Sequence, residues 1–191
     1  MTRVAGLILA AGEGRRFGGA KQLAPLDGLP VLAHVLGTAR AVGRLSPLVV
    51  VLGARAQEIR AAVDLTGVEV VVAEDWSEGQ AASLRAGIRA LGEAEGALVL
   101  LGDQPFITPE VVAGTLERRD PELDALRAAY DGVPGHPVLL SRRLLDRAGE
   151  LRGDVGFRDL LAGGRVGTWE AGHLCDPTDI DTQEQLEAVT R

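Results

Sequence analysis

The chain has 191 residues, of which 46% are hydrophobic and 25% charged, and its formal net charge is −7. This composition excludes a disordered chain, and the length favours one domain spanning residues 1–191. The acidic balance disfavours nucleic-acid binding, which usually needs a basic face. No apolar run reaches about 18 residues, so the sequence predicts no transmembrane helix and no membrane partner.

Apolar runs alternate with helical patterns along the first two thirds of the chain. The runs are nearly continuous, which is typical of strands buried on both faces of a parallel sheet. They lie at residues 4–11, 48–52, 68–73 and 97–101, and the helical patterns lie at 30–42, 56–63, 79–91 and 109–118. This alternation predicts an α/β fold with a doubly wound, mostly parallel sheet.

The later elements are less regular. Thr108 is expected to cap the helix that begins at Pro109. Beyond it we expect a turn at 134–137, a strand at 137–140, helices at 141–149 and 155–162, and a strand at 168–171. Asp181 or Thr182 should cap a last helix, with Glu184 or Gln185 placed for a capping box.

Two residue types occur once. Cys175 is the single cysteine, so no internal disulfide and no cysteine-based metal framework is possible, and a reducing cytoplasm is the expected location. Lys21 is the single lysine among 20 basic residues. In a chain that otherwise uses arginine, a lysine can mark a place that needs a compact point charge.

Lys21 ends a glycine-rich segment that follows the first predicted strand. Glycines let the backbone approach a ligand, and exposed amides with basic side chains form an anion site. The dinucleotide fingerprint fails by one residue, because the glycine spacing is G-x-G-x-x-x-G. The Walker A pattern fails because Ala20 precedes Lys21 and Gln22 replaces Ser or Thr. A nucleotidyltransferase phosphate loop is the third option.

Asp103 follows the buried run at 97–101, between a glycine and a proline-containing turn. An acid at the carboxyl end of a central strand sits where α/β folds bind ligands. A carboxylate beside phosphates is how Mg²⁺ is held, so Asp103 is the first predicted metal ligand. A second acid is available near the last helix, where Asp179 and Asp181 are both candidates.

The segment from Leu9 to Lys21 resembles the signature of nucleotide-sugar-type nucleotidyltransferases. Almost the whole chain is similar to the molybdenum cofactor cytidylyltransferase group of the MobA-like transferases. The blocks that carry this resemblance are residues 9–21, 78–87, 101–106, 135–138, 153–158 and 179–182. The resemblance implies a single-domain, Rossmann-like nucleotidyltransferase fold of the glycosyltransferase-A-like kind.

The resemblance also implies a reaction. A terminal phosphate of molybdopterin attacks the α-phosphorus of CTP and expels pyrophosphate, with Mg²⁺ as the cofactor. Lys21, Arg16 and Asp103 are the implied catalytic residues, and Asp103 and Asp181 the implied metal ligands, with Asp179 in reserve.

The remaining implied roles are binding roles. His136 and Asp154 are assigned to the acceptor. The nucleotide is expected to contact Leu9, Ala10, Ala11, Gly12, Gly14, Arg15, Arg16, Lys21, Gln80 and Ser83. A molybdoenzyme or its chaperone is a further possible partner.

Several alternatives stay open. The acceptor could be a sugar phosphate or an isoprenoid phosphate, and the donor could be GTP or ATP. A non-catalytic nucleotide-binding regulator would be expected to lose the acids, which are present here. A flavin or nicotinamide oxidoreductase is disfavoured by the failed fingerprint.

Overall fold

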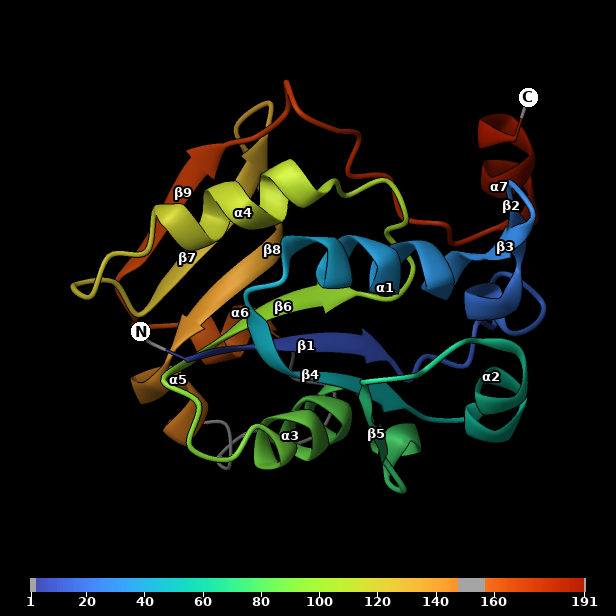
Figure 1. The fold of residues 1–191 in the computed structure, drawn as a ribbon, viewed down its shortest axis with the longest axis horizontal. Helices are drawn as coiled ribbons and strands as arrows, with labels where there is room; N and C mark the ends of the chain where they lie inside the picture. Colours follow the sequence, from blue (N-terminus) through green and yellow to red (C-terminus); the bar gives the residue numbers. More distant parts are fainter. Residues whose placement is uncertain (1–2, 148–156, 191) are drawn as a thin grey trace.

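The computed structural model describes residues 3–147 and 157–190. Within these residues, seven strands form one sheet in the order β5-β4-β1-β6-β8-β7-β9, and β2 and β3 form a separate pair (Figure 1). The strands are Val4–Ala10 (β1), Pro25–Leu26 (β2), Leu29–Pro30 (β3), Leu45–Leu52 (β4), Glu69–Val72 (β5), Gly96–Leu101 (β6), Ala125–Tyr130 (β7), Val133–Ser141 (β8) and Val166–Glu170 (β9).

The sheet is mostly parallel. β5, β4, β1 and β6 pair in parallel, as do β7 and β9, whereas β8 runs antiparallel to both of its neighbours. β1 lies centrally, with β4 on one side and β6 on the other. The predicted doubly wound α/β fold is therefore confirmed.

Helices cover both faces of the sheet. They are Val31–Val42 (α1), Ala56–Ala62 (α2), Gln80–Ala90 (α3), Pro109–Glu117 (α4), Arg142–Arg147 (α5), Phe157–Leu161 (α6) and Gln183–Val189 (α7), with short 3-10 turns at Lys21–Leu23 (η1) and Trp76–Glu78 (η2). In Figure 1, α1 and α4 lie along one side of the sheet and α3 and α5 along the other. The four helices expected before residue 120 begin and end within one residue of the predicted positions. No helix of the described ranges is long and apolar enough to cross a membrane.

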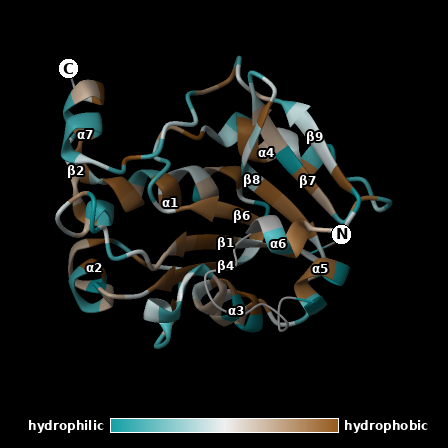
Figure 2. Cartoon of the chain, turned by 180° about the vertical axis from the view of Figure 1, so that it is seen from behind, coloured by the Kyte–Doolittle hydropathy of each residue, from teal (hydrophilic) through white to brown (hydrophobic). Residues whose placement is uncertain are grey.

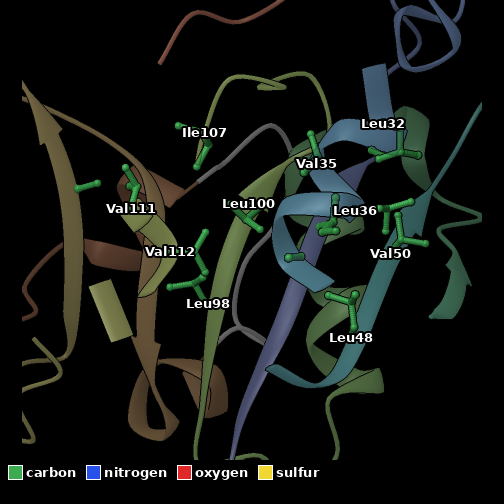
Figure 3. Close-up of a cluster of buried hydrophobic side chains, with 14 of the residues drawn as sticks. Leu32, Val35, Leu36, Leu48, Val50, Leu98, Leu100, Ile107, Val111 and Val112 are labelled. Carbon is green, nitrogen blue, oxygen red and sulfur yellow. The ribbon is translucent and has the colours of Figure 1, made fainter. Parts of the chain in front are cut away.

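The continuous apolar runs have a direct structural cause. Ile8 packs in the core under α1 and α4, whereas its neighbour Leu7 packs in the core under α3, and both side chains are fully buried. In β4, Val50 packs in the same core as Ile8, and its neighbour Val49 packs in the same core as Leu7. Figure 3 shows the first of these cores, and Figure 2 shows that the central strands are strongly hydrophobic.

Three local predictions were wrong. Ala125–Tyr130 forms β7, a strand that the sequence did not indicate, because its alanines carry little strand preference and burial between β8 and β9 decides its conformation. Residues 134–137 belong to β8, and the turn lies earlier, at Asp131 and Gly132, which both have positive φ. The last strand begins at Val166, two residues before the expected position.

The helix caps also gave a correction. Thr108 stands at the predicted start of α4, but its side chain makes no capping hydrogen bond. Thr182 caps α7, where its side chain accepts from the Gln185 N–H and Gln185 completes the capping box. Thr182 rather than Asp181 is therefore the cap, which leaves the Asp181 carboxylate available for other contacts.

The segment that precedes α7 packs against β2 and the start of α1. Ile180 is fully buried against Ala24, Leu26 and Val31, and its N–H donates to the Asp103 carbonyl at 2.9 Å. Figure 1 shows α7 beside β2 and β3, at the opposite end of the molecule from the N-terminus. This contact brings Asp179 and Asp181 to the end of β6.

Candidate active site

A cleft of about 910 Å³ lies at the carboxyl ends of β1 and β6. Leu9 of β1 pairs with Leu101 of β6 in parallel register, so the loops that follow these two strands lie side by side. The chain leaves β1 toward β4 and β5 on one side and later returns through β6 on the other. Such a switch point is where open α/β sheets bind ligands.

The glycine-rich loop after β1 is a compact turn. The Gly14 carbonyl accepts hydrogen bonds from the N–H groups of Phe17, Gly18 and Gly19, at 3.0, 3.0 and 3.3 Å. Gly14 has a φ of +71°, and a Cβ there would lie 2.0 Å from the Gly19 carbonyl oxygen. Only glycine fits this position without moving the turn.

Gln22 fastens this loop to the end of β1. Its side-chain amide is buried and donates to the carbonyls of Ala10 and Gly12, at 3.1 Å each. In the sequence, Gln22 is notable only because it breaks the Walker A pattern. No local pattern marked this role, because the burial of Gln22 follows only from the packing of the loop against the end of β1.

Four charged side chains meet at one edge of the cleft. The Lys21 ammonium donates to Asp103 Oδ2 and, at 2.7 Å, to Asp181 Oδ1. Arg16 pairs with the other oxygen of Asp181 at 2.9 Å. The Lys21 side chain is 12% exposed and that of Arg16 is 77% exposed, so Lys21 is the buried cation of the group.

Asp179 is a third carboxylate in this region. Its Oδ1 atom and the Oδ1 atom of Asp103 are both buried without a hydrogen-bond partner. Burial, followed by the negative charge of Asp103, raises the pKa of Asp179 above its usual value. Unsatisfied buried carboxylate oxygens are costly and require an explanation.

The pKa directions of the paired groups follow from these contacts. Burial lowers the pKa of Lys21, but the charges of Asp103 and Asp181 and the hydrogen bonds to them outweigh burial, and the pKa is raised. The hydrogen bond from Lys21 is the largest of the effects that lower the pKa of Asp181. Both groups are therefore charged at neutral pH.

These residues fit a divalent cation that also carries phosphate ligands. Asp103 and Asp181 converge on one point, which the Lys21 ammonium occupies, and Asp103 keeps one unsatisfied oxygen. Within the described part of the chain, no three His, Cys, Asp or Glu side chains are arranged to hold a metal by themselves. Mg²⁺ is usually held by one or two carboxylates plus substrate phosphates and water, so two acids suffice.

Most of the predicted site residues line the cleft. They are Leu9, Ala10, Ala11, Gly12, Arg15, Lys21, Gln80, Ser83, Asp103 and His136. Gly14, Arg16 and Asp181 lie outside this lining, although Arg16 and Asp181 join it through the ion pairs to Lys21. Asp154 lies outside the described residues.

The wall opposite the loop comes from η2 and the start of α3. Trp76 of η2 lines the cleft there. Gly53 at the end of β4 allows this approach, because a Cβ on it would lie 2.4 Å from the Ala11 carbonyl oxygen and 3.0 Å from the Trp76 Cβ. The lining residues that sequence analysis did not assign are Glu13, Gln22, Ser77, Glu78, Gly79, Leu84, Leu101, Gly102 and Asp159.

His136 lies on the wall formed by β8. Burial, helped by the charge of Arg127, lowers its pKa to about 3, so the ring is neutral at physiological pH. The Tyr130 hydroxyl donates to the His136 carbonyl at 2.6 Å and holds this backbone in place. Rings of this kind can accept or donate one hydrogen bond without adding charge.

Known proteins resemble the chain over most of its length. Nicotine blue oxidoreductase from Paenarthrobacter nicotinovorans is 34% identical over 195 residues, which covers 97% of this chain and 93% of that protein. The crystal structure of Rv0371c from Mycobacterium tuberculosis H37Rv is 33% identical, covers 99% of this chain and 97% of that one, and has a TM-score of 0.89. A structure of Rv0371c with manganese is 31% identical, with a TM-score of 0.84 and coverage of 99% of this chain and 98% of that one.

The family model that matches is the MobA-like NTP transferase domain, over residues 6–170. This range includes the glycine-rich loop, Gln22, Asp103 and His136, and it excludes Asp179 and Asp181. By this match over most of its length, the chain belongs to the MobA-like NTP transferase family.

Proposed function

We propose that the chain is a Mg²⁺-dependent cytidylyltransferase that transfers CMP from CTP to the terminal phosphate of molybdopterin and releases pyrophosphate. The observation that carries this proposal is the meeting of a basic, glycine-rich loop with Asp103 and Asp181 at one end of the cleft. The resemblance of residues 135–138 and 153–158 to the molybdenum cofactor group supports the pterin acceptor.

The reaction needs no nucleophile from the protein. An oxygen of the acceptor phosphate forms a bond to the α-phosphorus, the bond from that phosphorus to the bridging oxygen breaks, and pyrophosphate takes the electron pair. A phosphate monoester is mostly ionised at pH 7, so no general base has to remove a proton. Catalysis then consists of orientation and charge stabilisation.

The protein supplies both through residues of the cleft. Lys21, Arg15 and Arg16 balance the charge of the leaving pyrophosphate, and the backbone of Leu9, Ala10, Ala11 and Gly12 receives the nucleotide. Asp103 and Asp181 would hold Mg²⁺, which when bound neutralises phosphate charge and orients the phosphates. Gln80 and Ser83 lie where they can contact the base, and neutral His136 can contact the acceptor.

The proposal predicts a donor preference. Pyrophosphate release should be measured with each of the four nucleoside triphosphates, with and without molybdopterin. Release should depend on both CTP and the acceptor, because Ser83 and the loop backbone leave room for a small base. A clear preference for GTP would contradict the cytidylyl assignment and place the chain with guanylyltransferases.

The same assay tests the site. Asp103→Ala should abolish transfer while the melting temperature shows a folded protein. Asp146→Ala is the matched control, since Asp146 is an exposed aspartate that pairs with Arg142, and neither residue lines the cleft. Near-normal turnover in folded Asp103→Ala would overturn the assignment of this acid.

The relative named nicotine blue oxidoreductase gives a second candidate, a redox reaction, because it matches nearly the whole chain. Oxidation of NADH or NADPH should therefore be followed in parallel with a conjugated dye as the acceptor. Hydride transfer does not require a lysine between two carboxylates, whereas phosphoryl chemistry does use such groups. For this reason we favour nucleotidyl transfer over a redox reaction.

A further inference from the structure

Lys21 fills the position at which a cation would contact Asp103 and Asp181. Its ammonium bonds to both carboxylates and is nearly enclosed, with 12% of the side chain exposed. Arg16 occupies the second oxygen of Asp181. Of the oxygens of these two acids, only Asp103 Oδ1 is left buried without a partner.

A divalent cation cannot bind well beside this ammonium. Like charges a few ångströms apart repel strongly where water is partly excluded. The ammonium also uses the oxygen from each carboxylate that faces the shared point. A metal that takes both carboxylates therefore has to displace Lys21.

Lys21 has a second set of partners available when nucleotide arrives. It stands at the start of η1, at the end of the glycine-rich loop, and it lines the cleft. A lysine carries its charge on a flexible four-carbon stem, so the ammonium can move several ångströms while the backbone stays in place. Gln22 holds that backbone to the end of β1.

We propose that Lys21 is an internal stand-in for the metal, which keeps the carboxylates neutralised until nucleotide draws its ammonium away and the cation takes its place. This inference rests on the proposed function, in that it takes the ligand to be a nucleoside triphosphate with a divalent cation. It makes nucleotide binding and metal binding mutually dependent. By linkage, each ligand must tighten the other by the same factor.

The test measures the affinity of the full chain for Mn²⁺, first without nucleotide and then with CTP. The electron paramagnetic resonance signal of free Mn²⁺ reports how much of the metal is unbound. Wild type should bind Mn²⁺ weakly, and CTP should tighten binding by roughly 5–150-fold, the usual range of coupling between sites. Lys21→Met should bind Mn²⁺ without nucleotide more tightly than wild type, by a factor in the same range. Lys21→Arg should stay close to wild type, since a cation still lies between the acids.

Arg44→Met is the matched control, because it removes one positive charge from an exposed residue that pairs with Glu117 and does not line the cleft. Its affinity for Mn²⁺ should equal that of wild type. Melting temperatures of all variants, with and without Mn²⁺, report on folding, and Lys21→Met should gain more from Mn²⁺ than wild type does.

Equal or weaker Mn²⁺ binding in folded Lys21→Met than in wild type would overturn the stand-in role. The proposed function can fail separately. If Lys21→Met binds Mn²⁺ tightly but wild type releases no pyrophosphate from CTP and molybdopterin, the exchange of Lys21 for the metal is supported and the assigned reaction is wrong.

Discussion

His136 is a neutral histidine in a wall of the cleft, and this has a consequence for acid stability. Its pKa is about 3 in the folded protein, against an ordinary value of 6.5. The unfolded chain therefore binds the proton more readily, so the stability linked to neutral His136 is present above pH 6.5 and is lost as the pH falls toward 3.

His136→Gln should remove this dependence. The melting temperature of the variant, taken relative to wild type, should rise as the pH is lowered from 7 to 4. His173→Gln is the control, since His173 is exposed. Parallel curves for His136→Gln and wild type would show that the ring is not held neutral by the fold.

Thr182 and Asp181 are adjacent at the start of α7, yet their side chains do different things. Thr182 accepts from the Gln185 N–H, whereas Asp181 pairs with Lys21 and Arg16. Thr182→Ala should lower the stability of α7 by about 1 kcal/mol, the usual cost of a lost N-cap. Asp181→Ala should weaken Mn²⁺ binding in the presence of nucleotide.

Amide hydrogen exchange in residues 183–189 separates the two effects. Exchange should accelerate in Thr182→Ala and stay near the wild-type rate in Asp181→Ala. Equal acceleration in both variants would mean that Asp181 acts mainly by stabilising the helix.

At the level of elements, helices were easier to predict than strands. α1, α3 and α4 show their boundaries through local features, such as apolar spacing, Gly43 with positive φ after α1, and Pro109 at the start of α4. β7 has no such signal, because a strand is stabilised by neighbours distant in the sequence. The capping box of α7 was predicted because all of its contacts lie within four residues.

At the scale of the whole molecule, one buried side chain holds the C-terminal segment against β2 and α1, beside the site. Ile180 packs against residues of β2 and α1 and lies between Asp179 and Asp181. Ile180→Ala should lower the free energy of unfolding by roughly 2–5 kcal/mol, the range for a buried isoleucine cut to alanine. It should also weaken Mn²⁺ binding in the presence of nucleotide, because the two acids lose their fixed position.

Val111→Ala is the control for Ile180→Ala. Val111 is fully buried in α4, away from the cleft, so its truncation should destabilise the protein without changing Mn²⁺ affinity. Urea unfolding and Mn²⁺ titration should be carried out on both variants. Unchanged Mn²⁺ affinity in folded Ile180→Ala would show that the C-terminal segment keeps its place without this contact.

The sequence by itself determined the fold class, the glycine-rich loop and Asp103. Local apolar patterns predict the alternation of strands and helices. If the strands are parallel, the loops after β1 and β6 are expected to lie at the same edge of the sheet, where ligands bind. The sequence also singled out Lys21, because it is the single lysine of the chain. It left open whether Asp179 or Asp181 accompanies Asp103.

The tertiary structure decided which charges meet. Lys21 lies 82 residues from Asp103 and 160 from Asp181, and these separations are closed only by the sheet order and by the burial of Ile180. It also placed Trp76, Gln22 and the neighbours of Asp103 around one cleft. Contacts between such distant residues depend on the packing of the whole chain, and local patterns carry no information about them.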